Sequence, residues 1–309
     1  MPYCPLCKSN SALLIEVLKT SDLVELYRMS LGISVVQEFS GLDQISYYHC
    51  RDCELRYFFP MLTGSQDFYL FLQKFDWYYM DEKEEYALAG DFIKEDARVL
   101  EIGCGKGAFS NFIKTKNYTG IEFSAGAKEL AEQKGLRIIN ESIEHHAVNN
   151  RQKYDVVCSF QVLEHVSDVN GFIRASVECL DRNGIFIISV PNMDSFIGLA
   201  PNLTTNLPPH HVTHWSEKSL RSLAISFEID LVEICYESLA DFHGDWYKEI
   251  IWMNRLNRIF FRRQGLIDKS RAGTYLYAIS KRLVKYFPAG QKKRIKGHSV
   301  LAVYKKRNT

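Results

Sequence analysis

Three glycines, spaced by single residues, interrupt an apolar stretch near the middle of the chain and constrain its fold more than any other feature. The stretch covers residues 98–109 and reads RVLEIGCGKGAF. Val99 to Ile102 predict a short buried strand. A tight turn should follow, because glycine adopts positive φ angles at no steric cost; its glycines are Gly103, Gly105 and Gly107. A helical pattern comes next, with an apolar face of Phe109, Phe112 and Ile113.

Such a turn places backbone N–H groups toward a ligand, although many strand-to-helix turns carry glycine for packing alone. Two carboxylates strengthen the ligand interpretation. Glu101 lies inside the apolar strand, where an unpaired carboxylate is costly, so it should have a specific partner. Glu122 ends the next predicted strand, 19 positions after Gly103. An acid at the tip of the second strand can accept both hydroxyls of a ribose.

With these residues the chain resembles class I S-adenosylmethionine (SAM) dependent methyltransferases. The sequence EIGCGKG over residues 101–107, followed by Glu122, looks like their first two motifs. Dinucleotide oxidoreductases instead space their glycines G-x-G-x-x-G, so a nicotinamide enzyme fits less well. The resemblance implies SAM as cofactor and a Rossmann-like α/β fold with helices on both faces of the sheet. The SAM-binding residues that it implies are Glu101, Gly103, Cys104, Gly105, Gly107, Glu122, Phe123, Ser142, Ile143, Phe160 and Gln161.

Strand and helix patterns alternate after residue 98, which predicts a parallel sheet. Ser124 and Asp168 should each cap a helix, the first running over residues 125–134. A tight turn at residues 181–184 should precede the fifth strand. After the first two strands we expect strands at residues 136–139, 154–159, 185–190, 227–237 and 298–304.

Two C-x-x-C pairs stand near the N-terminus, Cys4 with Cys7 and Cys50 with Cys53. Two such pairs complete a closed tetrahedral site for structural Zn²⁺; free thiols or a redox pair are the alternatives. The 42 intervening residues need an inserted helix, which Leu23 to Tyr27 supplies. We therefore expect a zinc-ribbon module at 1–60, an aromatic-rich connector at 61–96, and the methyltransferase domain at 97–309. The connector aromatics either pack the zinc module onto the domain, which we favour, or cover the cofactor, and residues 81–85 should be a solvated helix start.

Histidines occur where this fold binds ligands, beyond the carboxyl ends of the strands. Glu164 and His165 follow the fourth predicted strand in a Leu-Glu-His sequence that resembles a family motif. The loop at 206–216 then holds His210, His211 and His214. Histidine can take a proton from a hydroxyl, and we expect His210 or His211 to be the general base, with His165 as a further catalytic candidate. Alternatively, the histidines bind a metal ion or hold the loop through hydrogen bonds to backbone carbonyls. The side chains of the adjacent His210 and His211 would diverge on an extended loop, which argues against a metal site. The loop, with Ser216 capping the helix after it, resembles zinc-ribbon methyltransferases that modify sugars and cell-surface glycans.

Global composition is ordinary, with a net charge of +1, but residues 248–296 hold fourteen Lys or Arg against two acids. Two amphipathic basic helices, including Arg262 and Phe287, are expected in an insertion at about 240–296. They would lie on an anionic membrane, hold a phosphorylated substrate, or form a solvated cap. We see no signal peptide and no apolar run of membrane-spanning length. Eight cysteines without a leader favour a reducing cytoplasm.

The predicted function is SAM-dependent methylation of a small hydroxylated acceptor, a sugar nucleotide or glycan-biosynthesis intermediate. One alternative is a nucleic-acid-associated methyltransferase that binds through its zinc ribbon, but no basic stripe accompanies the cysteines. Another is a catalytically silent SAM-binding protein. The acceptor atom and the oligomeric state are left open.

Overall fold

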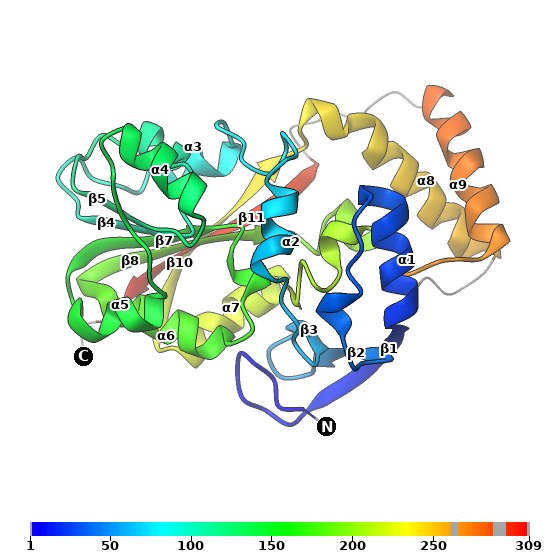
Figure 1. The fold of residues 1–309 in the computed structure, drawn as a ribbon, viewed down its shortest axis with the longest axis horizontal. Helices are drawn as coiled ribbons and strands as arrows, with labels where there is room; N and C mark the ends of the chain where they lie inside the picture. Colours follow the sequence, from blue (N-terminus) through cyan, green and yellow to red (C-terminus); the bar gives the residue numbers. More distant parts are fainter. Residues whose placement is uncertain (1, 261–264, 287–294, 308–309) are drawn as a thin grey trace.

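The computed structural model describes residues 2–260, 265–286 and 295–307. Two sheets organise these residues, one of seven strands and one of four. Figure 1 shows the seven-stranded sheet on the left, and the N-terminal strands together with α1, α8 and α9 on the right.

The larger sheet has the strand order β10-β11-β8-β7-β4-β5-β6. Five neighbouring strands, β8, β7, β4, β5 and β6, run parallel to one another. Strand β11 is antiparallel to both of its neighbours, β8 and β10. This arrangement confirms the predicted Rossmann-like sheet. The bounds are β4 Val99–Ile102, β5 Tyr118–Ile121, β6 Arg137–Ile139, β7 Tyr154–Phe160, β8 Leu180–Pro191, β10 Ile229–Ser238 and β11 Lys296–Lys306.

Helices cover both faces of this sheet, with α3 and α4 on one side and α5, α6 and α7 on the other (Figure 1). The predicted caps are confirmed: the side chains of Ser124, Asp168 and Ser216 accept backbone N–H bonds at the starts of α4, α6 and α7. These bonds satisfy N–H groups that a helix start otherwise leaves unpaired. The bounds are α3 Glu84–Gly90, α4 Ala125–Gln133, α5 Ile143–Asn149, α6 Val169–Cys179 and α7 Glu217–Ser226.

Two local predictions are wrong. The helix after the glycine turn is a short 3-10 helix, η2 Ala108–Phe112, because Gly107 opens it at φ 72° and Ile113 is already extended. The turn at residues 181–184 lies within β8, as an irregularity in its pairing with β7. The other 3-10 helices are η1 Gln37–Phe39, η3 Leu163–His165, η4 Phe196–Leu199, η5 Thr204–Asn206, η6 Asp241–His243 and η7 Val284–Tyr286.

The smaller sheet has the order β1-β2-β3-β9 and is antiparallel throughout. The predicted inserted helix is α1 Thr20–Leu31, between β1 and β2. The fourth strand, β9, comes from the histidine loop, which lies more than 150 residues after β3 in the sequence. The sequence did not predict this strand, because two residues are too few to show the alternation of a strand. The bounds are β1 Ala12–Lys19, β2 Gln44–Cys50, β3 Arg56–Phe59 and β9 Thr213–His214.

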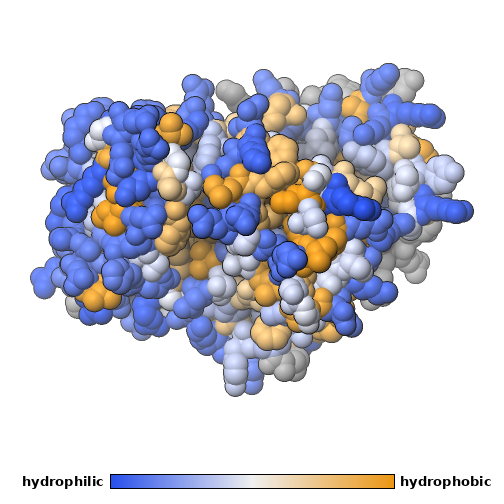
Figure 2. All heavy atoms as spheres, viewed as in Figure 1, coloured by the Kyte–Doolittle hydropathy of each residue, from blue (hydrophilic) through white to orange (hydrophobic). Residues whose placement is uncertain are grey.

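The aromatic connector contains α2 Gln66–Leu72. Phe68 and Leu72 are buried in one core with Leu23 and Tyr27 of α1, which confirms packing as a role of the connector. Figure 2 shows apolar side chains gathered near α2, whereas the surface over the helices of the larger sheet is mostly hydrophilic. The domain boundaries at residues 60 and 96 stay predictions.

The insertion between β10 and β11 contains α8 Gly244–Phe260 and α9 Arg271–Leu283, which confirms two helices there. Ile250 and Met253 of α8 pack with Phe196, Ile197 and Leu239, whereas Ile259 is exposed. Arg262 and Phe287 lie outside the described residues. Within the described chain, no helix is both long and apolar enough to cross a membrane. A role for this insertion in binding stays a prediction.

Candidate functional site

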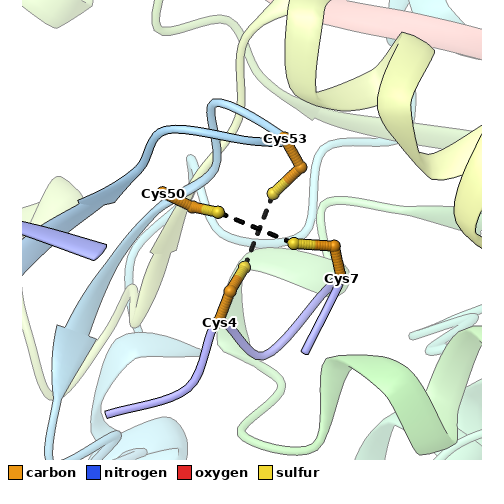
Figure 3. A group of neighbouring side chains, drawn as sticks. All are labelled: Cys4, Cys7, Cys50 and Cys53. Atoms are coloured by element: carbon orange, nitrogen blue, oxygen red, sulfur yellow. Dashed lines mark hydrogen bonds between the residues drawn. The ribbon is translucent and has the colours of Figure 1, made fainter. Parts of the chain in front are cut away.

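The four N-terminal cysteines converge on one point, as Figure 3 shows. The Sγ atoms of Cys4 and Cys53 are 3.5 Å apart, and those of Cys7 and Cys50 are 3.6 Å apart. Tetrahedral zinc with Zn–S bonds of about 2.3 Å separates its sulfur ligands by roughly 3.8 Å. The thiols therefore fit Zn²⁺ without rearrangement of the backbone.

The two cysteine loops share one geometry. Lys8 N–H donates to the carbonyl of Cys4, and Glu54 N–H donates to that of Cys50. Both donors have left-handed φ angles, 60° and 65°. These bonds close each loop so that the thiol groups face inward (Figure 3).

The glycine turn has the backbone geometry that the sequence predicted, with φ angles of 70°, 52° and 72° at its glycines. The N–H groups of Gly103 and Cys104 both donate to the carbonyl of Ile121, which ties the turn to the end of β5. A Cβ atom at Gly103 would lie 2.5 Å from a methyl group of Val162. Glycine is required here by conformation and by packing.

Glu122 lies directly beside this turn. Its carboxylate accepts N–H bonds from Gly105 (2.8 Å) and Ser124 (2.7 Å). Burial raises the pKa of Glu122, while these backbone N–H bonds favour its ionised form. The predicted ribose acceptor therefore also fixes the conformation of the glycine turn.

Glu101 has the specific partner that its position required, the phenol of Tyr118 at the start of β5, which donates to its carboxyl group. Its side chain is buried, and burial raises the pKa of Glu101 to about 8. The carboxyl group is therefore largely protonated at neutral pH in the ligand-free protein.

The other predicted cofactor residues lie in three different environments. Phe123 is 63% exposed beside Glu122, and Ser142 caps α5 ahead of the buried Ile143, so these residues follow the ends of β5 and β6. Cys104 and Phe160 instead belong to the core under the turn. Gln161 adopts φ 57° at the end of β7, and its amide donates to Glu85 at 2.9 Å.

Sequence reasoning missed Glu85 in this region, and it considered Tyr79 only as one of the connector aromatics that pack or cover the cofactor. Glu85, predicted to be solvated, is 2% exposed and accepts from both Gln161 and Ser189. Tyr79 of the connector covers the glycine turn, since a Cβ atom at Gly105 would lie 2.8 Å from its ring. Glu85 belongs to a charged run, which is typical of a solvated surface. Tyr79 is one of many aromatic residues in the connector, and the sequence does not show which of their rings contacts the glycine turn.

Three of the four candidate histidines meet. The ring centroids of His165, His210 and His211 are between 4.5 and 4.8 Å apart. His210 and His211 stack instead of diverging, because the loop is not extended: both of their N–H groups donate to the carbonyl of Leu207. Glu164 lies under them, with Oε1 3.8 Å from Nε2 of His165 and 3.9 Å from Nε2 of His211.

Burial dominates the electrostatics of this group. It raises the pKa of Glu164 to about 8 and lowers the pKa of His165 to about 4. The pKa values of His210 and His211 also lie well below the usual value, first because of burial. His214 does not join the group: its ring nitrogens contact the phenol of Tyr47 and the carbonyl of Asn206, each at 2.6 Å. It ties the loop to the smaller sheet.

Comparison with known proteins identifies the region that carries these residues. Residues 74–234 match the family model described as a methyltransferase domain. The ubiquinone biosynthesis O-methyltransferase of Vibrio vulnificus strain YJ016 is 28% identical over 169 residues, covering 49% of this chain and 71% of that protein. Its counterpart from Actinobacillus pleuropneumoniae serotype 7 is 26% identical over 188 residues, covering 53% and 79%.

A solved structure shows the same fold. The SAM-dependent methyltransferase from Archaeoglobus fulgidus aligns with a TM-score of 0.51 at 15% identity, covering 77% of this chain and 99% of that one. The residues that match the family model contain the glycine turn and the parallel strands β4, β5, β6, β7 and β8 of the larger sheet.

Proposed function

Because the chain belongs to the methyltransferase-domain family and is a SAM-dependent methyltransferase, we propose that it methylates a hydroxyl group of a small polyhydroxylated acceptor. A sugar or an intermediate of glycan biosynthesis is the acceptor that we favour. The observation that carries this proposal is the group formed by three histidines and Glu164, a residue that lies two positions after Val162, which contacts the glycine turn.

The glycine turn fits the cofactor. SAM supplies a methyl group that its sulfonium has already activated, so the protein mainly has to align the reactants. Gly105 allows close approach to the backbone, and Glu122 presents a carboxylate for ribose hydroxyls. Exposed Phe123, which follows it, offers a ring face for the adenine.

The histidines are placed to manage the proton of the acceptor. A hydroxyl oxygen must lose its proton as it is methylated, and an imidazole or carboxylate within reach can accept it. Val162 touches the glycine turn, and Glu164 and His165 follow it two and three positions later in the chain. The proton-accepting groups therefore lie beside the cofactor turn, and we assign proton transfer to His165, His210 and His211 together with Glu164.

Polar side chains near the ends of β7, β8 and β11 favour a polyhydroxylated acceptor over an apolar one. Gln161 approaches the hydroxyl groups of Ser189 and Ser299 at 3.2 and 3.3 Å. The amide nitrogen of Asn192 is buried and has no hydrogen-bond partner among the described residues. An unpaired buried donor is costly, and an acceptor hydroxyl would satisfy it. The relatives from Vibrio and Actinobacillus, named as O-methyltransferases, agree with an oxygen acceptor.

We also propose that Cys4, Cys7, Cys50 and Cys53 hold a structural Zn²⁺ ion. Four thiolates leave no coordination position for a substrate, so the ion stabilises the module and takes no part in the reaction. No disulfide joins any of the eight cysteines, all of which lie in the described part of the chain, and this supports a reducing compartment such as the cytoplasm.

Calorimetric titration tests the cofactor assignment. SAM and NAD are titrated separately into zinc-loaded protein and into Glu122→Ala, with Glu129→Ala, an exposed position on α4, as the matched control. We expect micromolar SAM binding by wild type and control, at least tenfold weaker binding by Glu122→Ala, and no binding of NAD. Folded wild-type protein that fails to bind SAM would contradict the proposal.

Transfer of a labelled methyl group tests the acceptor class. Nucleoside diphosphate sugars and simple phenols are offered in parallel, and the label is located by mass spectrometry. We expect an O-methylated sugar; labelling of phenols alone would overturn the acceptor class and leave the cofactor assignment intact.

A further inference from the structure

Three imidazole rings and one carboxyl group converge in the interior, and several of their polar atoms have no hydrogen-bond partner among the described residues. We call His165, His210, His211 and Glu164 the histidine–glutamate cluster. One ligand nitrogen from each of the three histidines lies within 4.8 Å of the others. Glu164 is 1% exposed, and among the described residues neither of its carboxyl oxygens has a hydrogen-bond partner. The same is true of Nε2 of His210.

The contacts of the three Nδ1 atoms show which nitrogen of each histidine ring carries the proton. Nδ1 of His165 lies 2.6 Å from the carbonyl of His210, and Nδ1 of His210 lies 3.0 Å from the carbonyl of Thr205. Nδ1 of His211 lies 3.0 Å from the side-chain oxygen of Asn206. A carbonyl oxygen only accepts, so each Nδ1 carries the proton and each Nε2 keeps a lone pair.

This tautomer pattern is the one that metal-binding histidines have. Their distal nitrogen donates to a carbonyl or carboxylate, which fixes the ring and directs the other nitrogen at the ion. Here all three rings are fixed in that way, by oxygen atoms of three different residues.

A proton does not satisfy this arrangement. Glu164 does not form a hydrogen bond with the rings, because its carboxyl oxygen lies 3.8 Å from Nε2 of His165 and 3.9 Å from Nε2 of His211, beyond hydrogen-bond range. Ligands of one zinc-sized ion, with bonds of about 2.0–2.1 Å, lie roughly 3.3–3.5 Å apart. The three histidine nitrogens, which lie within 4.8 Å of one another, would therefore have to approach by up to about 1.5 Å to coordinate one ion.

We propose that the histidine–glutamate cluster binds one divalent transition-metal ion of the zinc class through the three Nε2 atoms, with the carboxylate of Glu164 balancing its charge. Imidazole ligands favour zinc, cobalt, nickel and copper over magnesium or calcium. The site is separate from the cysteine site: none of its ligands comes from the N-terminal module, and only the folded chain brings η3 and the histidine loop together.

This inference rests on the proposed function for its chemical role, although not for its geometry. Three nitrogen ligands leave a coordination position for the acceptor oxygen. The charge of the ion would favour the ionised form of Glu164 and would lower the pKa of the bound hydroxyl, whose proton would pass to that carboxylate. The oxygen then attacks the methyl carbon as the bond from that carbon to sulfur breaks, which yields the methylated acceptor and S-adenosylhomocysteine. The histidines would in that case be ligands, and Glu164 the proton acceptor.

Cobalt is the probe that tests the site. Zinc-loaded protein is treated with a mild chelator and titrated with Co²⁺, while bound metal is measured by mass spectrometry and visible absorption. We expect cobalt bands without the sulfur-to-metal charge transfer that a cysteine site produces. His210→Gln and Glu164→Gln should lose this binding at least tenfold in affinity. His145→Gln, which removes an exposed histidine of α5, controls for surface binding and should keep it.

The outcomes are distinct. Absence of cobalt binding beyond the cysteine site, or equal binding by wild type and His210→Gln, overturns the inference. Calorimetry with SAM on the same variants shows whether the fold and the cofactor site are retained. If chelator-treated protein binds SAM and transfers methyl groups at the full rate, the metal inference fails while the proposed function stands.

Discussion

Replacing Glu101 by Gln should stabilise the ligand-free protein and remove a large part of its pH dependence. The carboxyl group is buried inside β4, and burial raises its pKa from the ordinary value of 4.5 to about 8. The unfolded chain releases this proton near pH 4.5, whereas the folded chain keeps it until about pH 8. The associated stability is thus complete below pH 4.5 and is lost as the pH rises to about 8.

The size of the effect follows from the same two values. Each pH unit between them costs the folded state about 1.4 kcal/mol, so the cost at pH 7 is about 3 kcal/mol. Gln at position 101 carries no proton to lose, and its amide oxygen can still accept from the phenol of Tyr118. The stability gain of Glu101→Gln should therefore grow by about 3 kcal/mol between pH 5 and pH 8.

Urea unfolding of the zinc-loaded, SAM-free protein at several pH values measures this difference. Other buried carboxyl groups, including Glu164 and Glu237, titrate equally in both proteins and cancel. Glu129→Gln, at an exposed position on α4, should match wild type at every pH. A difference between Glu101→Gln and wild type that is constant from pH 5 to pH 8 would refute the reasoning.

Three further outcomes are expected. Cys53→Ser should lose the structural zinc and destabilise the chain by several kcal/mol, because zinc binding is coupled to folding; metal analysis with urea unfolding measures both. Gly105→Ala should weaken SAM binding at least tenfold in calorimetry, since its φ of 52° costs alanine about 1–2 kcal/mol and the new methyl group would meet the ring of Tyr79. Ser216→Ala should cost about 1 kcal/mol in urea unfolding through loss of the capping box at α7.

Much of the fold was predictable because its signals are local. The apolar strand ending at Gly103, the cap at Ser124 and the two C-x-x-C pairs each depend on a few adjacent residues. Glu101 was also informative, since the cost of burying a carboxylate requires a partner even when the sequence does not show which one.

The remaining features depend on contacts between distant residues. His165 meets His210 and His211 only after η3 and the Pro-Pro loop fold together, and the sequence placed His214 with them instead. Glu85 belongs to a charged run that resembles a solvated helix start, yet Gln161 and Ser189 bury it. Such pairings are set by tertiary packing, which neither periodicity nor spacing encodes.

The pairing of β9 with β3 has a consequence for any attempt to isolate the catalytic part of the chain. Residues 74–234 match the methyltransferase domain, and that segment contains the histidine loop but not its strand partner. In the full chain, Phe58 donates to the carbonyl of Val212, and Tyr47 contacts His214. A fragment of residues 74–234 would retain every residue of the histidine–glutamate cluster, but it would lose β2 and β3, whose contacts hold the histidine loop in place. The N-terminal module thus supports the proposed site through its contacts with the histidine loop, and the two should be inherited, exchanged and engineered as one unit.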